Sequence, residues 1–280
     1  MSPVAVATCA VDDIDPDQPM LLAALDAAGV AAEPAVWDDG AVDWDRFDLV
    51  VLRSTWDYAA RRPAFLDWAR GVARLANPYR VVEYSSDKHY LADLERRGQR
   101  VVQSTFLDVG APVHFPDVDF VVKPCVGVGS IDVERYRPDE RARASAHVAR
   151  LHDAGRDVLV QPYVDSVDVV GERALIFVDG SFSHAMTKGA MLNVAPDVRT
   201  MLYRRQQMSR VDPEPDAVSF AEAVLAATGF EDLLYARVDA VRTPAGWAVL
   251  ELELVEPSLF LAFEPGAARR LAEAVARRVG

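Results

Sequence analysis

Four charged residues near the C-terminal end of the chain have the spacing of a site for a metal ion and an anion. Arg237 and Asp239 stand two apart, and so do Glu251 and Glu253. Residues two apart in a strand point to the same side, and residues 244–246 carry a hairpin signal between the two runs. Three carboxylates on one face would repel one another without a cation, and magnesium prefers such oxygen ligands. We predict Asp239, Glu251 and Glu253 as metal ligands; the alternative is a solvent-exposed hairpin.

Two lysines and a glycine turn could bind phosphate. Lys88 precedes an expected helix, Lys123 ends an expected strand, and the turn Gly127-Val128-Gly129-Ser130 follows closely. Glycine lets the backbone approach a phosphate and present successive N–H groups to it. Alone, the glycines could form an ordinary hairpin turn, and a lysine could be solvated surface. Their order along the chain favours a nucleotide phosphate site.

Strands that alternate with helices predict a small parallel α/β domain over residues 1–82. Strands are expected at residues 4–8 and 48–52, and helices at residues 20–28 and 65–75. Ligands of open parallel sheets bind beyond the carboxyl ends of the strands, where the loops 9–15 and 53–58 fall. A guanidinium and an indole in the second loop could hold a small amino acid; the alternative is a helix cap with a packing tryptophan. The substrate candidates here are Arg53, Ser54 and Asp57.

The rest of the chain divides into segments 83–165 and 166–280. In the first, helices are expected at residues 90–97, after the N-cap signature 85–87, and at 141–152, with strands at 120–123 and 157–164. The second is strand-rich, with strands at 173–178, 182–187, 234–241 and 247–255 and helices at 218–227 and 264–279. Asp179-Gly180 predicts a hairpin, and residues 191–210 predict a mobile loop. The leucines between the acids of the last strand are expected to point away from them: Leu250, Leu252 and Leu254.

Composition excludes several partners. The chain of 280 residues carries a net charge of −13 and has a pI near 4.8. An acidic surface repels phosphate backbones and anionic lipid, which argues against nucleic acid and membranes. No apolar run approaches the roughly 18 residues of a membrane span, and the first residues lack a basic leader. Two distant cysteines, Cys9 and Cys125, make no disulfide framework, so we expect a cytoplasmic protein.

Taken in order over roughly residues 80–265, these motifs resemble the ATP-grasp superfamily. The resemblance implies an α/β fold with an N-terminal parallel domain, a small lid subdomain and a strand-rich C-terminal subdomain of α+β type. It implies ATP and Mg²⁺, with Lys88 and Lys123 on the nucleotide phosphates under a closing glycine loop. Arg237 would steady an acyl phosphate and its oxyanion, and Lys188 would reach the terminal phosphates unless it forms a surface salt bridge. Glu253 stands where the family usually has asparagine, and its register against Glu256-Pro257-Ser258 is open by one residue.

The segment 159–164 resembles the family's hinge, where adenine binds. The resemblance places Gln161, Tyr163 and Val164 beside adenine and makes Asp168 the candidate for the ribose hydroxyls. The alternative is that Gln161 and Asp168 are ordinary polar residues at a strand end. Ser258 is a further substrate candidate.

Residues 52–58, 85–88, 123–130 and 250–260 look like the subgroup that contains the D-cycloserine-forming ligase. That resemblance implies a small amino-acid-like substrate, O-ureido-D-serine, whose activated carboxylate is attacked by its own ureido nitrogen before the carbamoyl group is lost. An intermolecular ligase of amino acids or dipeptides is the enzymatic alternative. A non-catalytic, ATP-binding regulatory protein is the alternative of another class, although it would need no oxyanion arginine. A homo-oligomer stays open.

Overall fold

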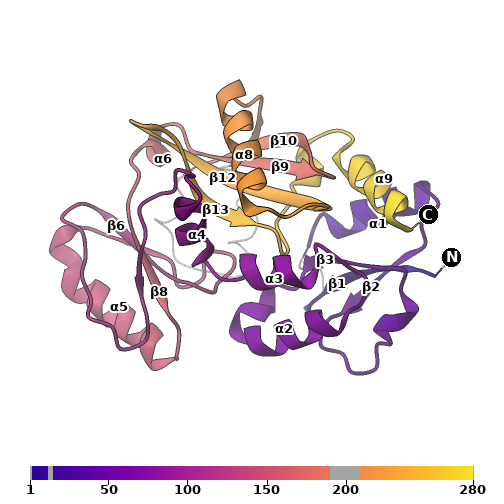
Figure 1. Ribbon diagram of the computed structural model, residues 1–280, viewed down its shortest axis with the longest axis horizontal. Coiled ribbons are helices and arrows are strands. Elements are labelled where there is room, and N and C mark those ends of the chain that lie inside the picture. The colour runs from indigo at the N-terminus through magenta and orange to yellow at the C-terminus, as the bar shows by residue number, and fades with distance from the viewer. Residues whose placement is uncertain (1, 12–14, 190–207, 280) are drawn as a thin grey trace.

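Three β-sheets follow one another along the chain, one in each of the three predicted segments. The structure is a computed structural model that describes residues 2–11, 15–189 and 208–279. In Figure 1 the second sheet lies to the left, the third above the centre and the first to the lower right. The segments therefore meet around a shared centre, to which all three sheets contribute.

The first sheet is parallel, with strand order β2-β1-β3-β4. Its central strands β1 (Val4–Thr8) and β3 (Leu49–Ser54) are buried throughout, as expected for a sheet covered on both faces. Both were predicted. Strand β2 (Ala32–Val36) was not predicted, because Pro34 weakens its strand signal; proline is tolerated there because β2 is an edge strand.

Helices α1 (Gln18–Ala27) and α2 (Arg62–Gly71) belong to this first unit. The helix predicted at residues 65–75 is misplaced: a proline in the first turn starts α2 earlier, and Leu75–Ala76 form the short strand β4. Helix α3 (Tyr79–Ser85) then takes up part of the predicted N-cap signature, and α4 (Tyr90–Arg96) follows.

The second sheet is antiparallel, with order β5-β8-β6-β7. Its strands are β5 (Thr105–Leu107), β6 (Phe120–Pro124), β7 (Glu134–Tyr136) and β8 (Val158–Pro162). Helix α5 (Arg141–Asp153) covers one face through a core that includes Val122, Val148 and Leu151. The predicted strands β6 and β8 and helix α5 are confirmed within a few residues, whereas the short strands β5 and β7 were not predicted.

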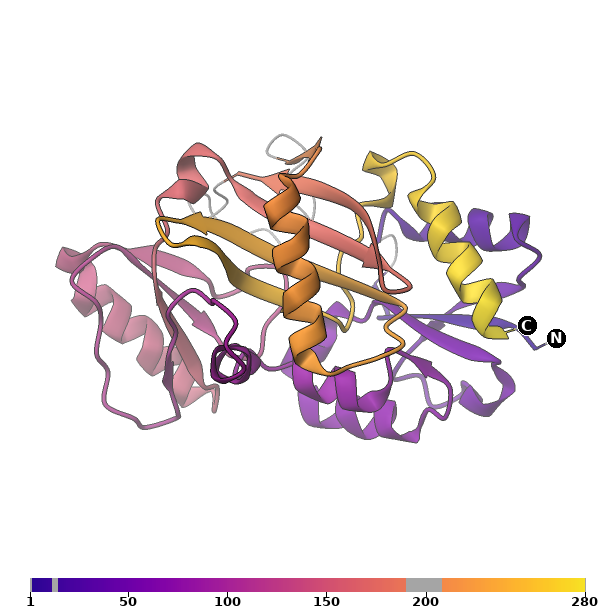
Figure 2. The same ribbon diagram turned by 45° about the horizontal axis from the view of Figure 1, so that its top comes forward.

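The third sheet has the order β11-β10-β9-β12-β13 and follows the short helix α6 (Ser166–Val169). Its strands are β9 (Glu172–Val178), β10 (Ser181–Lys188), β11 (Met208–Val211), β12 (Tyr235–Thr243) and β13 (Gly246–Glu253). Asp179 and Gly180 turn between β9 and β10 with φ of 52° and 74°, as the predicted hairpin requires. Figure 2 shows α8 (Pro215–Thr228) lying diagonally across this sheet. Most of the predicted mobile loop 191–210 lies outside the described residues, but its last residues belong to β11.

The last part of the chain packs against the preceding segments at several places. The terminal helix α9 (Ala267–Val279) packs against α1, where Leu271 and Val275 share a core with Leu21 and Leu25. Helix α4 contacts the outer edge of β13, where the N–H of Leu252 donates to the Tyr90 hydroxyl at 2.9 Å. Four short 3₁₀ turns complete the described elements: Trp44–Arg46, Trp56–Ala60, Pro138–Glu140 and Leu261–Phe263. In the described part of the chain, no helix has the length and apolar character needed to span a membrane.

Candidate active site

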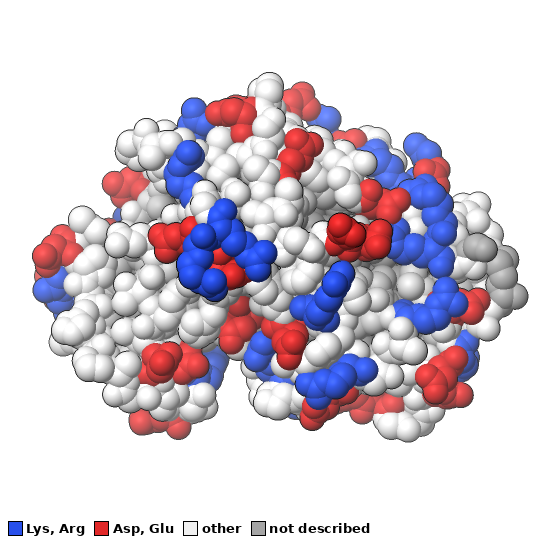
Figure 3. Space-filling view, in the orientation of Figure 1, with Lys and Arg blue, Asp and Glu red and all other residues white. Residues whose placement is uncertain are grey.

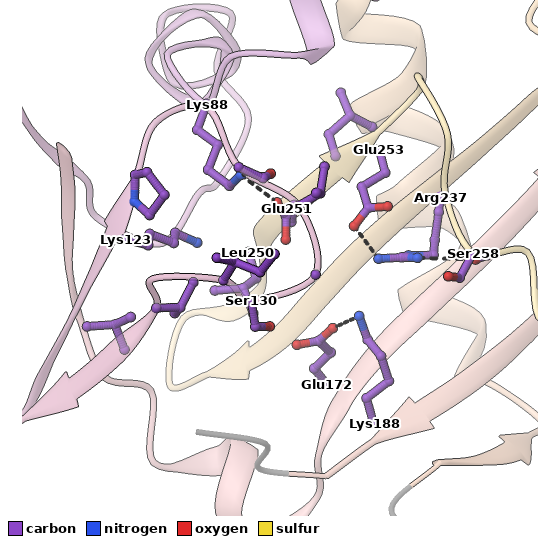
Figure 4. A pocket seen from close by; sticks show the side chains of 18 of the residues that line it. Lys88, Lys123, Ser130, Glu172, Lys188, Arg237, Leu250, Glu251, Glu253 and Ser258 are labelled. Carbon is purple, nitrogen blue, oxygen red and sulfur yellow. Dashed lines mark hydrogen bonds and ion pairs between the residues drawn. The ribbon is translucent and has the colours of Figure 1, made fainter. Parts of the chain in front are cut away.

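One pocket lies where the three sheets meet, and each contributes to its lining. Its walls come from the turn after β3, the β6–β7 loop, the end of β8, and strands β9, β10, β12 and β13. Figure 3 shows acidic and basic side chains interspersed over one face of the molecule, so the net negative charge is not gathered there. Figure 4 shows charged side chains from separate strands converging in the pocket.

The hairpin of β12 and β13 brings the four charged residues together as predicted. Arg237 pairs in register with Glu253, and Asp239 with Glu251. One carboxylate oxygen from each of the three acids lies within 4.8 Å of the other two. The alternative of a solvent-exposed hairpin is wrong, because Asp239 is only 1% exposed and both glutamates are largely covered.

Leu250 departs from the prediction that the leucines of β13 point away from the acids. Leu252 and Leu254 do join the core on the opposite side. A β-bulge between Asp239 and Ala240 shifts the register, however, and Leu250 lines the pocket beside Glu251. Bulges re-aim a side chain in this way and are common next to functional sites. Leu250 thus adds an apolar surface to an otherwise charged wall.

Cations from several strands neutralise these acids. Lys188 donates to Asp239 at 2.7 Å, Arg237 donates to the same carboxylate at 2.8 Å, and Lys88 lies 3.0 Å from Glu251. Burial opposes ionisation of Asp239, but Arg237 and Lys188 outweigh it and hold its pKa at about 2. Glu253 hydrogen-bonds to Arg237, yet burial together with the two neighbouring acids raises its pKa to about 7. These cations therefore keep Asp239 ionised, whereas Glu253 retains its proton to a higher pH.

Glu172, at the start of β9, is a site residue that sequence reasoning missed. It lines the pocket and forms an ion pair with Lys188. Lys188 itself is 6% exposed, so the surface salt bridge considered for it is wrong. Glu172 could have been noticed as an acid at the start of a strand whose last five residues are all apolar.

The predicted phosphate residues lie at the other end of the pocket. Lys88 and Lys123 are both more than nine-tenths buried, and Lys88 also donates to the carbonyl of Gly127 at 3.1 Å. Burial, together with nearby Lys88, lowers the pKa of Lys123, which forms no ion pair or hydrogen bond through its amine within the described residues. The chain contains three lysines in all, and Lys88, Lys123 and Lys188 all line this pocket. Every other strong cation of the chain is arginine.

The glycine turn forms the lip of the pocket between β6 and β7. A side chain at Gly127 would place its Cβ 2.9 Å from Cγ of Pro124, so this position needs glycine. Gly129 and Ser130 both have positive φ, 61° and 58°. Such a backbone is strained at a serine, and both residues line the pocket.

The expected adenine segment is only partly placed as predicted. Gln161, Tyr163 and Val164 line the pocket, although the side-chain amide of Gln161 donates to Ser104 at 2.9 Å. Asp168 does not line the pocket: the Tyr163 hydroxyl donates to it at 2.5 Å, and Arg135 holds it at 3.1 Å. Glu172, not Asp168, is the acid that faces the space next to this segment.

The end of β3 and the turn after it also differ from the prediction, because Arg53 and Ser54 are buried away from the pocket and Asp57 is held by other side chains. Arg53 is fully buried and donates to the carbonyl of Pro257 at 2.9 Å. Ser54 bonds to Thr8, and Asp57 accepts from the Trp37 indole at 2.8 Å. None of these three candidates lines the pocket, where Trp56 and Tyr58 stand instead.

The segment after β13 closes the site. Ser258 lines the pocket as predicted, and its carbonyl accepts from Arg237 at 3.1 Å. Glu256 also lines the pocket; burial, and then nearby Glu253, raises its pKa to about 8. The three acids whose oxygens converge are Asp239, Glu251 and Glu253, and Glu256 is not among them.

Known proteins resemble this chain both in sequence and in fold. Residues 4–77 match the family described as D-cycloserine synthetase DcsG, N-terminal domain. Over its full length the chain is 42% identical to the cycloserine biosynthesis protein DcsG of Streptomyces lavendulae, and it covers 99% of that protein. The crystal structure of D-cycloserine synthetase DcsG matches with a TM-score of 0.88 at 39% identity, over 99% of each chain.

Two more distant structures share the fold alone. The D-alanine–D-alanine ligase of Bacillus anthracis, complexed with ATP, has a TM-score of 0.69 at 14% identity, over 100% of this chain and 97% of that one. The ATP-grasp ligase PsnB, complexed with a phosphomimetic variant of a minimal precursor, Mg and ADP, has a TM-score of 0.64 at 15% identity, over 99% of this chain and 98% of that one. The predicted ATP-grasp fold is confirmed, and by its full-length identity the chain belongs to the DcsG family of ATP-grasp ligases, enzymes that form carbon–nitrogen bonds.

Proposed function

We propose that this enzyme cyclises O-ureido-D-serine to D-cycloserine in the cytoplasm, with ATP converted to ADP and phosphate. The γ-phosphoryl group of ATP goes to the substrate carboxylate, which gives an acyl phosphate. The ureido nitrogen of the same molecule attacks the acyl carbon and gives up its proton, and phosphate leaves. Water then removes the carbamoyl group from the ring nitrogen as carbamic acid, which decomposes to carbon dioxide and ammonia. The observation that carries this proposal is the 42% identity over the full length to a cycloserine biosynthesis protein.

The chemistry of the pocket fits ATP with magnesium. Asp239, Glu251 and Glu253 offer a converging set of oxygen ligands, and magnesium bound there would neutralise charge on the phosphates. Lys123 is a buried cation without an anionic partner among the described residues, which suits a phosphate oxygen. Glu172 is better placed than Asp168 to accept hydrogen bonds from the ribose hydroxyls.

The chain's own groups supply positioning and charge stabilisation. Lys88 and Lys123 would hold the nucleotide phosphates, and Lys188 the phosphoryl group in transfer. Arg237 lies beside Ser258 and would stabilise the oxyanion that forms when nitrogen attacks. The Gly127–Ser130 turn at the lip would exclude water, which would otherwise hydrolyse the acyl phosphate.

The test is mass spectrometry of a reaction of purified protein with ATP, Mg²⁺ and O-ureido-D-serine, without any added amine. D-Cycloserine, ADP and phosphate are expected. ATP turnover that needs a second amino acid and yields a dipeptide would show an intermolecular ligase instead. An absence of turnover with every amino acid, despite ATP binding, would favour a regulatory protein.

A further inference from the structure

Glu256 presents a buried carboxylate to the pocket, and no described residue pairs with that carboxylate. Glu256 is 7% exposed and lines the pocket together with Trp56, Tyr58 and Ser258. Within the described ranges, its carboxylate makes no hydrogen bond and no ion pair. Burying a carboxylate without compensation is costly, so a protein keeps such a group where a bound ligand supplies the missing partner.

The other acids of the pocket differ from Glu256 in this respect. Glu172 and Asp239 are paired with Lys188, Glu251 with Lys88, and Glu253 with Arg237. The three acids that could hold a metal ion form a separate group. Glu256 is therefore outside that group and forms no ion pair with a lysine or arginine among the described residues, which leaves its carboxylate available to a cation that arrives with the substrate.

The backbone around Glu256 is held firmly in place. The Trp56 indole donates to the carbonyl of Glu256 at 3.1 Å, and Arg53 donates to the carbonyl of Pro257 at 2.9 Å. The Tyr235 hydroxyl donates to the carbonyl of Val255 at 2.8 Å. A backbone that is fixed before binding has less conformational entropy to lose on binding, which suits a segment that orients a small ligand.

We propose that Glu256 binds the α-ammonium group of the amino-acid substrate and so selects amino acids over carboxylic acids without an amino group. This assignment rests on the proposed ligase function. Arg237 on β12 contacts the same short segment by donating to the carbonyl of Ser258. The anion proposed for the ammonium group of the substrate therefore lies on a segment that also contacts the cation proposed for the substrate's carboxylate. An α-amino acid carries those two charges on groups bonded to the same carbon, and the site would fix both.

The test compares Glu256→Gln with the wild type on two compounds, O-ureido-D-serine and its deamino counterpart, in which hydrogen replaces the α-amino group. Glutamine keeps the shape but loses the charge. Wild type is expected to prefer the amino compound in kcat/KM by about 10- to 100-fold, as for a hydrogen bond between charged groups. In Glu256→Gln this preference should nearly vanish while the KM for ATP stays close to that of the wild type. Glu256→Asp, which keeps the charge, should retain part of it.

Glu273→Gln on the exposed face of α9 is the matched control and should keep the full preference. A wild-type enzyme that uses the deamino acid equally well, or a Glu256→Gln variant that still prefers the amino compound, would overturn the assignment. If ATP turnover requires an amino acid other than O-ureido-D-serine, the proposed reaction fails, and the same comparison with that amino acid and its deamino form still tests Glu256. Thermal unfolding of each variant verifies that it is folded.

Discussion

Lys188 on β10 donates a hydrogen bond to Asp239 on β12 over 2.7 Å, although strand β9 runs between them. Glu172 at the start of β9 pairs with the same lysine. Arg237 reaches Asp239 from its own strand. The floor of the pocket is thus a network of alternating charges on three strands, and any ligand that binds the acids must share them with these cations.

Asp239→Asn should lose turnover by more than about 100-fold and also lower stability, because two buried cations lose a shared anion. Removing one partner from a buried network costs on the order of 3 kcal/mol. Glu251→Gln should lose activity to a similar extent with a smaller loss of stability, because Glu251 has a single lysine partner and its side chain is 29% exposed. Steady-state rates at limiting Mg²⁺ and thermal unfolding check both. Near-normal activity in either variant would contradict the metal assignment.

Amine-selective labelling of lysine side chains should be confined to the pocket, because the protein's three lysines all lie there. Lys123 should react first at mildly alkaline pH, since burial lowers its pKa and its amine has no partner among the described residues. Lys88 and Lys188 should react slowly, because neighbouring carboxylates raise the pKa of each against the opposing effect of burial. Peptide mass mapping measures the order, and ATP should protect Lys123. Labelling of Lys123 at an equal rate with and without ATP would exclude it from the nucleotide site.

Sequence patterns predicted the parts of this fold that local chemistry determines. The buried run of β3, the Asp179-Gly180 turn and the two-residue spacing of Arg237 and Asp239 each carry their own signal, and the structure confirms them. The edge strand β2 and the short strands β5 and β7 carry little signal, because their pairing depends on neighbours distant in sequence. The ends of α2 were also missed, since one proline moved its start.

For the site, spacing predicted which charged residues come together, but it did not always predict where a side chain points. Arg53 looked like a ligand residue at a strand end, yet it is drawn into the interior by Asp15 and the carbonyl of Pro257. Leu250 was predicted to point away from the acids, but a β-bulge places its side chain in the pocket. Both outcomes depend on tertiary contacts that a local pattern does not contain.

Glu172→Gln should raise the dissociation constant for ATP about 10-fold or more, which is the usual effect of losing a hydrogen bond to a charged acceptor. Asp168→Asn should change this constant little. The reason is position: Glu172 lines the pocket, but Asp168 is held outside it by Tyr163 and Arg135. Isothermal titration calorimetry with ATP and Mg²⁺ compares the two variants. A larger loss in Asp168→Asn would restore Asp168 as the ribose residue.

Glu256 should make the ligand-free protein lose stability as the pH rises. Burial and then Glu253 raise its folded-state pKa to about 8, whereas a glutamic acid in an unfolded chain ionises near pH ~4.3. Between these values the folded state holds more protons than the unfolded state, so the free energy of unfolding falls with increasing pH. This loss is complete once the pH exceeds the folded-state pKa.

Glu256→Gln removes that ionisable group. Its melting temperature should differ little from that of the wild type near pH ~5. Near pH ~8 it should exceed that of the wild type by several degrees, which corresponds to roughly 1–3 kcal/mol in the free energy of unfolding. Calorimetry across this range, without nucleotide or substrate, measures the divergence. Glu273→Gln should follow the wild-type curve, because its carboxylate lies on an exposed helix face beside Arg269. Parallel curves for the wild type and Glu256→Gln would mean that Glu256 is already ionised and compensated in the empty site, and that its carboxylate has no need of a substrate cation.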